Sequence, residues 1–101
     1  MIHSVKCYPE FFSSLKDGTK TFEVRKNDRP YAVGDFLAVN EYASFDPYED
    51  VREELIERFD RSDGKGRYSG DCLLFRITYI LDDPQFTAKD MIILGLARCE
   101  I

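Results

Sequence analysis

The sequence predicts an α+β protein of mainly β structure, built as a small curved or closed sheet with helices on its flank. Short apolar or alternating segments, typical of strands, recur along most of the chain. Patterns typical of amphipathic helices interrupt them twice, and the connections between strands are long. This order of elements favours a sheet that curls or closes and carries its helices on the outside.

Length and composition indicate one globular unit. The chain has 101 residues, of which 44% are hydrophobic and 33% charged, so we expect a single folded domain over residues 1–101 rather than a disordered chain. No window approaches the ~20 apolar residues of a membrane helix. The amino terminus also lacks the order of a signal peptide. We therefore expect a cytoplasmic protein without a membrane segment.

The expected strands are bounded by turn residues and rich in alternating or β-branched side chains. They cover residues 2–7, 20–26, 36–42, 72–81 and 91–101. The run at 72–81 is so apolar that we expect a central strand with most side chains covered. Gly95 indicates a bulge or a close backbone approach in the last strand.

Two helices and one loop complete the predicted elements. Pro9 suits the first position of a short helix that ends at Gly18, and the apolar spacing within residues 44–60 predicts a second, acidic helix. Residues 62–70 are rich in glycine and predict a loop or hairpin, the most mobile internal segment.

Charge and cysteine content exclude several classes of function. A net charge of −5 argues against a strongly basic protein that binds nucleic acid without regard to sequence, although residues 16–29 retain a local excess of basic groups. The three cysteines are far apart and lie among apolar residues, as reduced core cysteines do. Because His3 is the only histidine and ligand spacing is absent, we expect neither a metal site nor a cofactor.

Residues 18–35 combine a turn, an alternating strand and a dense group of charges. On such a strand Phe22 and Val24 share one face. The opposite face carries Thr21, Glu23 and Arg25. Donors and acceptors this close can recognise a polar ligand. The alternative is that Glu23 and Arg25 form an ion pair that only stabilises the fold.

Each candidate side chain suggests a different role. Lys20 can contact a phosphate as a point charge, whereas Arg25 offers a planar fork to a phosphate or a base edge. Glu23 can accept from an exocyclic amine or a sugar hydroxyl while it holds Arg25 in place. Lys6 is expected to project from the outer face of the first strand, and the role of Arg29 stays open.

Several polar and aromatic residues have structural alternatives. Asn27 and Asp28 are typical of a turn, and His3 is expected to be a hydrogen-bonded core histidine. Tyr31, Tyr42, Tyr68 and Tyr79 could stack on bases, although packing is the commoner fate. We expect Tyr79 to be buried in the central strand, which leaves Tyr68 as the better stacking candidate.

The chain resembles the ASCH domains of the PUA-like superfamily, especially a bacterial and phage branch of unknown function. The residues that carry the resemblance are His3, Lys6, Pro9, Glu10, Phe12, Gly18, Lys20, Thr21, Phe22, Glu23, Arg25, Asn27, Asp28, Arg29, Gly34, Asp35, Glu41, Tyr68, Ser69, Gly70, Ile77, Thr78, Tyr79, Ile80, Leu81, Leu94, Gly95 and Leu96. Relative to shorter members, residues 43–58 look like an inserted helix.

The resemblance implies a PUA-like mixed β-barrel whose cleft, near the Gly-x-Lys-Thr segment, accepts RNA or a nucleotide. Some ASCH proteins are amidohydrolases that deacylate N4-acetylcytidine with a lysine, a threonine and a glutamate. The lysine matches Lys20, but the threonine falls on Glu23, which cannot replace a hydroxyl nucleophile. Glu41 is a candidate for the glutamate.

Three functions follow as expectations. The first is binding of RNA or a modified nucleoside, and its residues are Lys6, Lys20, Thr21, Glu23, Arg25, Arg29 and Tyr68. The second is an amidohydrolase on an N4-acylated cytidine, with Lys20 as base or nucleophile and Glu23 in proton transfer. The third is an interaction module that docks a protein partner through the acidic helix at residues 47–59.

Overall fold

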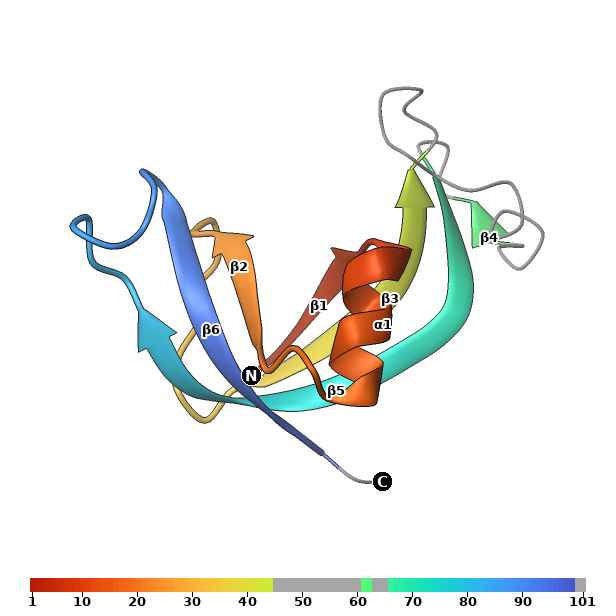
Figure 1. Cartoon of the computed structure of the whole chain (residues 1–101), viewed down its shortest axis with the longest axis horizontal. Helices are drawn as coiled ribbons and strands as arrows, with labels where there is room; N and C mark the ends of the chain where they lie inside the picture. The colour runs from red at the N-terminus through yellow and green to blue at the C-terminus, as the bar shows by residue number, and fades with distance from the viewer. Residues whose placement is uncertain (45–60, 63–65, 100–101) are drawn as a thin grey trace.

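The computed structural model describes residues 1–44, 61–62 and 66–99, which form one curled sheet with a single short helix (Figure 1). The elements are β1 (Ile2–Cys7), α1 (Pro9–Asp17), β2 (Phe22–Lys26), β3 (Phe36–Ser44), β4 (Arg61–Ser62), β5 (Gly66–Leu81) and β6 (Met91–Arg98). The predicted α+β class of mainly β structure is confirmed. Among the described residues, no helix has the length and apolar character needed to span a membrane.

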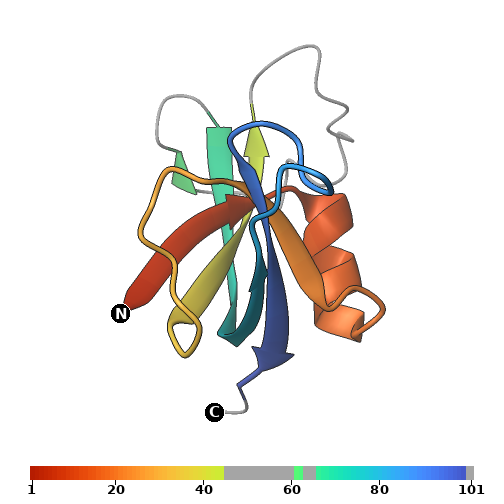
Figure 2. The same cartoon turned by 90° about the vertical axis from the view of Figure 1, so that its left-hand side faces the viewer.

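The strands follow the order β1-β3-β5-β6-β2, with β4 paired to β5 off this path. β1 runs parallel to β3, and the remaining pairs are antiparallel. β5 is one long bent strand that passes from one wall of the open barrel to the other (Figures 1 and 2). The bend brings the two outer strands of the path together, since a β2 side chain bonds a β1 carbonyl.

The core lies on the concave face of the sheet. Its buried members are Val5, Cys7, Phe12, Leu15, Leu37, Val39, Leu73, Phe75, Ile77, Ile92, Leu94 and Leu96. Phe12 and Leu15 come from α1, which starts at Pro9 and stops where Gly18 adopts a φ of 85°. Burial alternates along β1, with His3, Val5 and Cys7 inside, so the predicted face of this strand is confirmed.

Of the two predictions for residues 62–70, a loop or a hairpin, the hairpin is confirmed, because Arg61 and Ser62 of β4 pair antiparallel with Tyr68 and Arg67 of β5. Residues 66–68 also pair with the end of β3. Gly66 is needed there for space, not for a turn, because a Cβ atom would collide with the carbonyl of Ala43 and the ring of Tyr42. Glycine therefore marks a close approach inside a strand pair.

The expectation that residues 72–81 are mostly covered is wrong. β5 is central in the strand order, but only alternate side chains of this stretch are buried, and Tyr79 is 64% exposed. The register shifts between Ile77 and Tyr79, opposite Gly95. A Cβ at Gly95 would lie 3.1 Å from that of Tyr79, which confirms the predicted close approach.

Part of the predicted organisation falls outside the described residues. The second helix was expected at residues 44–60, or as an insertion at 43–58. Of these residues the structure describes only Ala43 and Ser44, and both lie in β3. The partner-docking proposal for residues 47–59 concerns that same part of the chain. The last strand ends at Arg98, before the predicted end at 101.

Candidate ligand-binding groove

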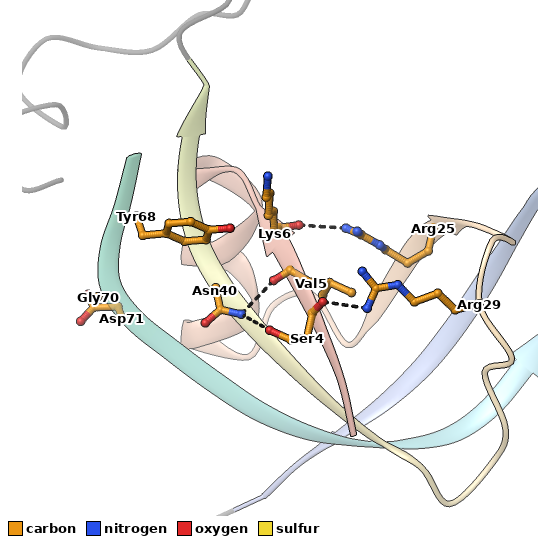
Figure 3. A pocket seen from close by; sticks show the side chains of 9 residues that line it. All are labelled: Ser4, Val5, Lys6, Arg25, Arg29, Asn40, Tyr68, Gly70 and Asp71. Carbon is orange, nitrogen blue, oxygen red and sulfur yellow. Dashed lines mark hydrogen bonds between the residues drawn. The ribbon is translucent and has the colours of Figure 1, made fainter. Parts of the chain in front are cut away.

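A groove with a volume of about 430 Å³ opens beside the outer face of β1 (Figure 3). It is lined by Ser4, Val5 and Lys6 of β1, Arg25 of β2, Arg29 of the following loop, Asn40 of β3, and Tyr68, Gly70 and Asp71 of β5. Ser4 and Lys6 reach it because they alternate with the buried residues of β1. One face of β1 therefore packs in the core, and its other face lines this polar groove.

Two guanidinium groups form one side of the groove. Arg25 Nη1 donates to the carbonyl of Lys6 at 2.9 Å, and Arg29 Nη1 donates to the carbonyl of Ser4 at 2.8 Å. Both carbonyls belong to β1, so Arg25 joins β1 to β2, and Arg29 joins β1 to the loop that follows β2, where no backbone ladder is described. A guanidinium has further N–H donors, and among the described residues Arg29 has no carboxylate partner.

The opposite side carries acceptors. The Asn40 Nδ2 atom lies within 3.0 Å of Ser4 Oγ, 3.1 Å of the Val5 carbonyl and 3.3 Å of the Ala38 carbonyl. The two carbonyls can only accept, so they orient the side-chain amide with its nitrogen toward them. The Oδ1 atom is left as an acceptor toward β5, where Asp71 lines the same groove (Figure 3).

The Tyr68 ring lines the end of the groove near β5 and packs against the buried Tyr42. The Tyr42 and Tyr68 rings are 4.9 Å apart and tilted by 59°. Lys6 Nζ lies 4.5 Å from the centre of the Tyr42 ring and 6.0 Å from that of Tyr68, so its charge rests against aromatic faces. Figure 3 shows the Tyr68 hydroxyl directed into the groove, between Lys6 and Asn40.

Glu23 and Lys20 form a separate, buried cluster. Glu23 is 4% exposed, and its Oε1 atom is 2.5 Å from Lys20 Nζ while Oε2 is 3.6 Å from Arg25 Nη1. The Lys20 ammonium also lies 5.2 Å from the Phe11 ring and 5.3 Å from the Phe22 ring. On β2 the charged face thus turns inward, whereas Phe22 and Val24 are exposed.

Cys7 lies next to this cluster, opposite Glu41 in the parallel register of β1 and β3. Burial is the main cause that raises the pKa of its thiol to about 12, and the carboxylates of Glu23 and Glu41 raise it further against the opposing effect of Lys20 and Arg25. The thiol stays protonated near neutral pH and is a poor nucleophile.

His3 is a hydrogen-bonded core residue, as predicted. It is 4% exposed, and its Nε2 atom lies 2.8 Å from Asp35 Oδ2. This hydrogen bond is the main cause that lowers the pKa of Asp35 below its usual value. The contact ties β1 to the loop that carries Arg29.

The groove gathers four of the seven residues predicted for a binding site, namely Lys6, Arg25, Arg29 and Tyr68. Lys20 and Glu23 pair in the buried cluster, and Thr21 is exposed outside the groove, with its carbonyl bonded to the Leu96 amide. The sequence alone could have predicted Ser4 as a groove residue, because it shares the outer face of β1 with Lys6. Asn40 and Asp71 could be assigned to the groove only once the strand register was known.

No group of three or more His, Cys, Asp or Glu side chains within residues 1–44, 61–62 and 66–99 is placed to hold a metal ion. The groove residues instead present fixed donors on one side and fixed acceptors on the other.

Comparison with known proteins places the chain in a family but assigns no activity. The sequence matches no curated protein. Over residues 2–96 it matches the model of a family described as a domain of unknown function, DUF3850. Because that match covers nearly the whole chain, the protein belongs to the DUF3850 family.

Proposed function

We propose that this protein binds RNA or a modified nucleoside in the groove beside β1. One observation carries the proposal: two arginines with unused N–H donors face an aromatic ring across an open space of about 430 Å³. A volume of this size falls within the ~300–1,000 Å³ range of small-molecule sites. Guanidinium groups bind phosphate in bidentate fashion, and an aromatic ring contributes ~1–3 kcal/mol per stacked base.

The net charge of the chain does not oppose this proposal. Between residues 45 and 60 the sequence carries seven carboxylates and two arginines. This segment alone therefore has a net charge of −5, equal to the net charge of the whole chain. The groove has its own local balance, with Lys6, Arg25 and Arg29 against Asp71. A site that contacts one phosphate needs only such a local excess, not a basic protein.

The resemblance to ASCH domains of the PUA-like superfamily supports the same function. Within the described part of the chain, a curled mixed sheet with one short helix is consistent with that likeness. In the proposed site Arg25, Arg29, Lys6 and Tyr68 contact the ligand. Lys20 and Glu23 lie outside the groove and stabilise the fold beside it, with Glu23 Oε2 3.6 Å from Arg25 Nη1.

Calorimetric titration with CMP and with single-stranded RNA tests the proposal. Loss of a charge-assisted phosphate contact in Arg29→Ala should weaken binding about tenfold or more. Arg98→Ala is the matched control, since Arg98 also donates to a backbone carbonyl, that of Lys16 at 2.8 Å, but lies outside the groove. Equal affinity in wild type and Arg29→Ala would refute the assignment.

An amidohydrolase is the second candidate, and direct contact between Lys20 and Glu23 favours it. A lysine and a carboxylate this close can exchange a proton during hydrolysis of an N4-acylated cytidine. Neither residue lines the groove, so a substrate would have to approach from elsewhere. Incubation with N4-acetylcytidine and chromatography decides the matter, because no product at high protein concentration would end this proposal.

A further inference from the structure

We infer that the groove selects nucleotides whose base carries an exocyclic amino group, as cytosine and adenine do, over those with a keto oxygen at that position. The inference rests on the proposed function and concerns the specificity of the same site. It follows from the acceptor Asn40 Oδ1 of the groove, a residue that the predicted binding residues do not include.

The first acceptor is Asn40 Oδ1, whose orientation is set by the protein. The Nδ2 atom of the same amide lies close to the carbonyls of Val5 and Ala38, so a reversed amide would place two carbonyls against an oxygen. The amide therefore cannot turn over to suit a ligand that needs a donor. Among the described residues no donor contacts Oδ1, which leaves it available to an amino group.

The second acceptor residue, Asp71, is exposed and lines the same end of the groove, but Figure 3 draws its carboxylate on the side of β5 away from Asn40. Gly70 precedes it with a φ of 92°, a conformation that bends β5 at this point. The Asp71 amide donates to Ser69 Oγ at 3.1 Å, so the bend is held by a local hydrogen bond. An ionised carboxylate only accepts, and this one has no described side-chain partner.

The two sides of the groove therefore have opposite polarity. Arg25 and Arg29 offer donors near β2, whereas Asn40 Oδ1 is an acceptor directed toward β5, and the Tyr68 ring lies beside the space between them (Figure 3). A nucleotide with its phosphate at the arginines presents its base toward Asn40. An amino group donates to Asn40 Oδ1, but a keto oxygen meets another acceptor there and stays unsatisfied.

The test compares two pairs of nucleotides that differ at this group, CMP with UMP and AMP with IMP, by titration into the full chain. CMP and AMP should bind about tenfold tighter than UMP and IMP, because sites built to pair a polar group reject analogues that lack it. Asn40→Ala removes the fixed acceptor and should bring the CMP to UMP ratio close to one.

The control is Asn27→Ala, which removes an exposed side-chain amide outside the groove. It should keep the wild-type ratio. Equal binding of all four nucleotides, with loss of affinity in Arg29→Ala, would overturn this inference and leave the proposed function intact. Absence of binding, or binding that Arg29→Ala does not weaken, would overturn both. Unchanged selectivity in Asn40→Ala would also overturn this inference.

Discussion

The buried cluster around Glu23 and the open groove beside Arg29 use charge in opposite ways, although the stretch at residues 18–35 supplies charged side chains to both. In the cluster, Lys20 and Glu23 are in direct contact and largely shielded from water. In the groove, Arg25 and Arg29 donate to backbone carbonyls and keep further donors. Exposure and partners, not residue type, thus separate charges that hold the fold from charges that can bind a ligand.

The energetic consequences differ as well. Removing one partner of a buried pair leaves a charge without compensation in a medium of low dielectric constant, which destabilises the fold. Removing an exposed guanidinium costs little stability, because water replaces it. Changes in the cluster should therefore alter unfolding, and changes in the groove should alter binding.

The largest expected effect concerns thiol reactivity in the buried cluster. With the pKa of Cys7 at about 12, only on the order of 10⁻⁴ of its thiol is ionised at about pH 8. In the Cys72→Ala/Cys99→Ala protein, Cys7 should react with a thiol reagent about a thousandfold more slowly than an unfolded cysteine. The exposed Cys72, alone in Cys7→Ala/Cys99→Ala, is the control and should react readily. Fast labelling of Cys7 in folded protein would show that the cluster is open.

The next effect is on stability. Lys20→Met leaves Glu23 buried with only Arg25 at 3.6 Å, and should lower the free energy of unfolding by about 3 kcal/mol in urea titrations. Nucleotide binding by the folded variant should be nearly unchanged. Lys20→Met/Glu23→Gln removes the stranded charge and should recover part of the stability. A large loss of affinity at full stability would instead place Lys20 in the binding site.

A smaller effect is expected from the ring in the groove. Tyr68→Leu removes the stacking surface and should weaken CMP binding about fivefold to tenfold, in keeping with ~1–3 kcal/mol per stacked base. Tyr68→Phe keeps the ring and should bind nearly as well as wild type. If the two variants bind equally, stacking on this side chain plays no part.

The smallest effect lies at the link between β1 and the Arg29 loop, and it depends on pH. The pKa of Asp35 is lowered in the folded state, mainly by its hydrogen bond with His3, so its contribution is present above the usual value of 3.8 and is lost as the pH falls through the folded value. Asp35→Asn should therefore be less stable than wild type near neutral pH. Denaturant titrations should show this difference shrinking in acid, and a constant difference would contradict the assignment.

Local patterns were sufficient for much of the fold. Alternation along residues 2–7 predicted the buried face of β1, and Pro9 and Gly18 predicted the bounds of α1. The same alternation placed Glu23 and Arg25 on one face of β2. It did not predict that this charged face turns inward, because the direction depends on which strands cover it.

Two features of β5 depend on long-range packing. The glycines of residues 62–70 suggested a loop or a hairpin, and Gly66 lies in a strand of the hairpin, where a Cβ atom would collide with the Tyr42 ring. Tyr79 suggested a covered position in an apolar run, yet it is exposed beside the register shift opposite Gly95. Neither the neighbouring ring nor the shift belongs to the local sequence of the residue concerned.

The sequence by itself determined the mainly β class, the strands and helix of the described chain within a few residues, and a charged segment between residues 18 and 35. Only the tertiary structure divided that segment into a buried ion pair and an open groove, and only it added Asn40 and Asp71 to the groove. The physical reason is that periodicity along a strand sets which residues share a face. Curvature and register, which arise from contacts between distant strands, set what that face meets.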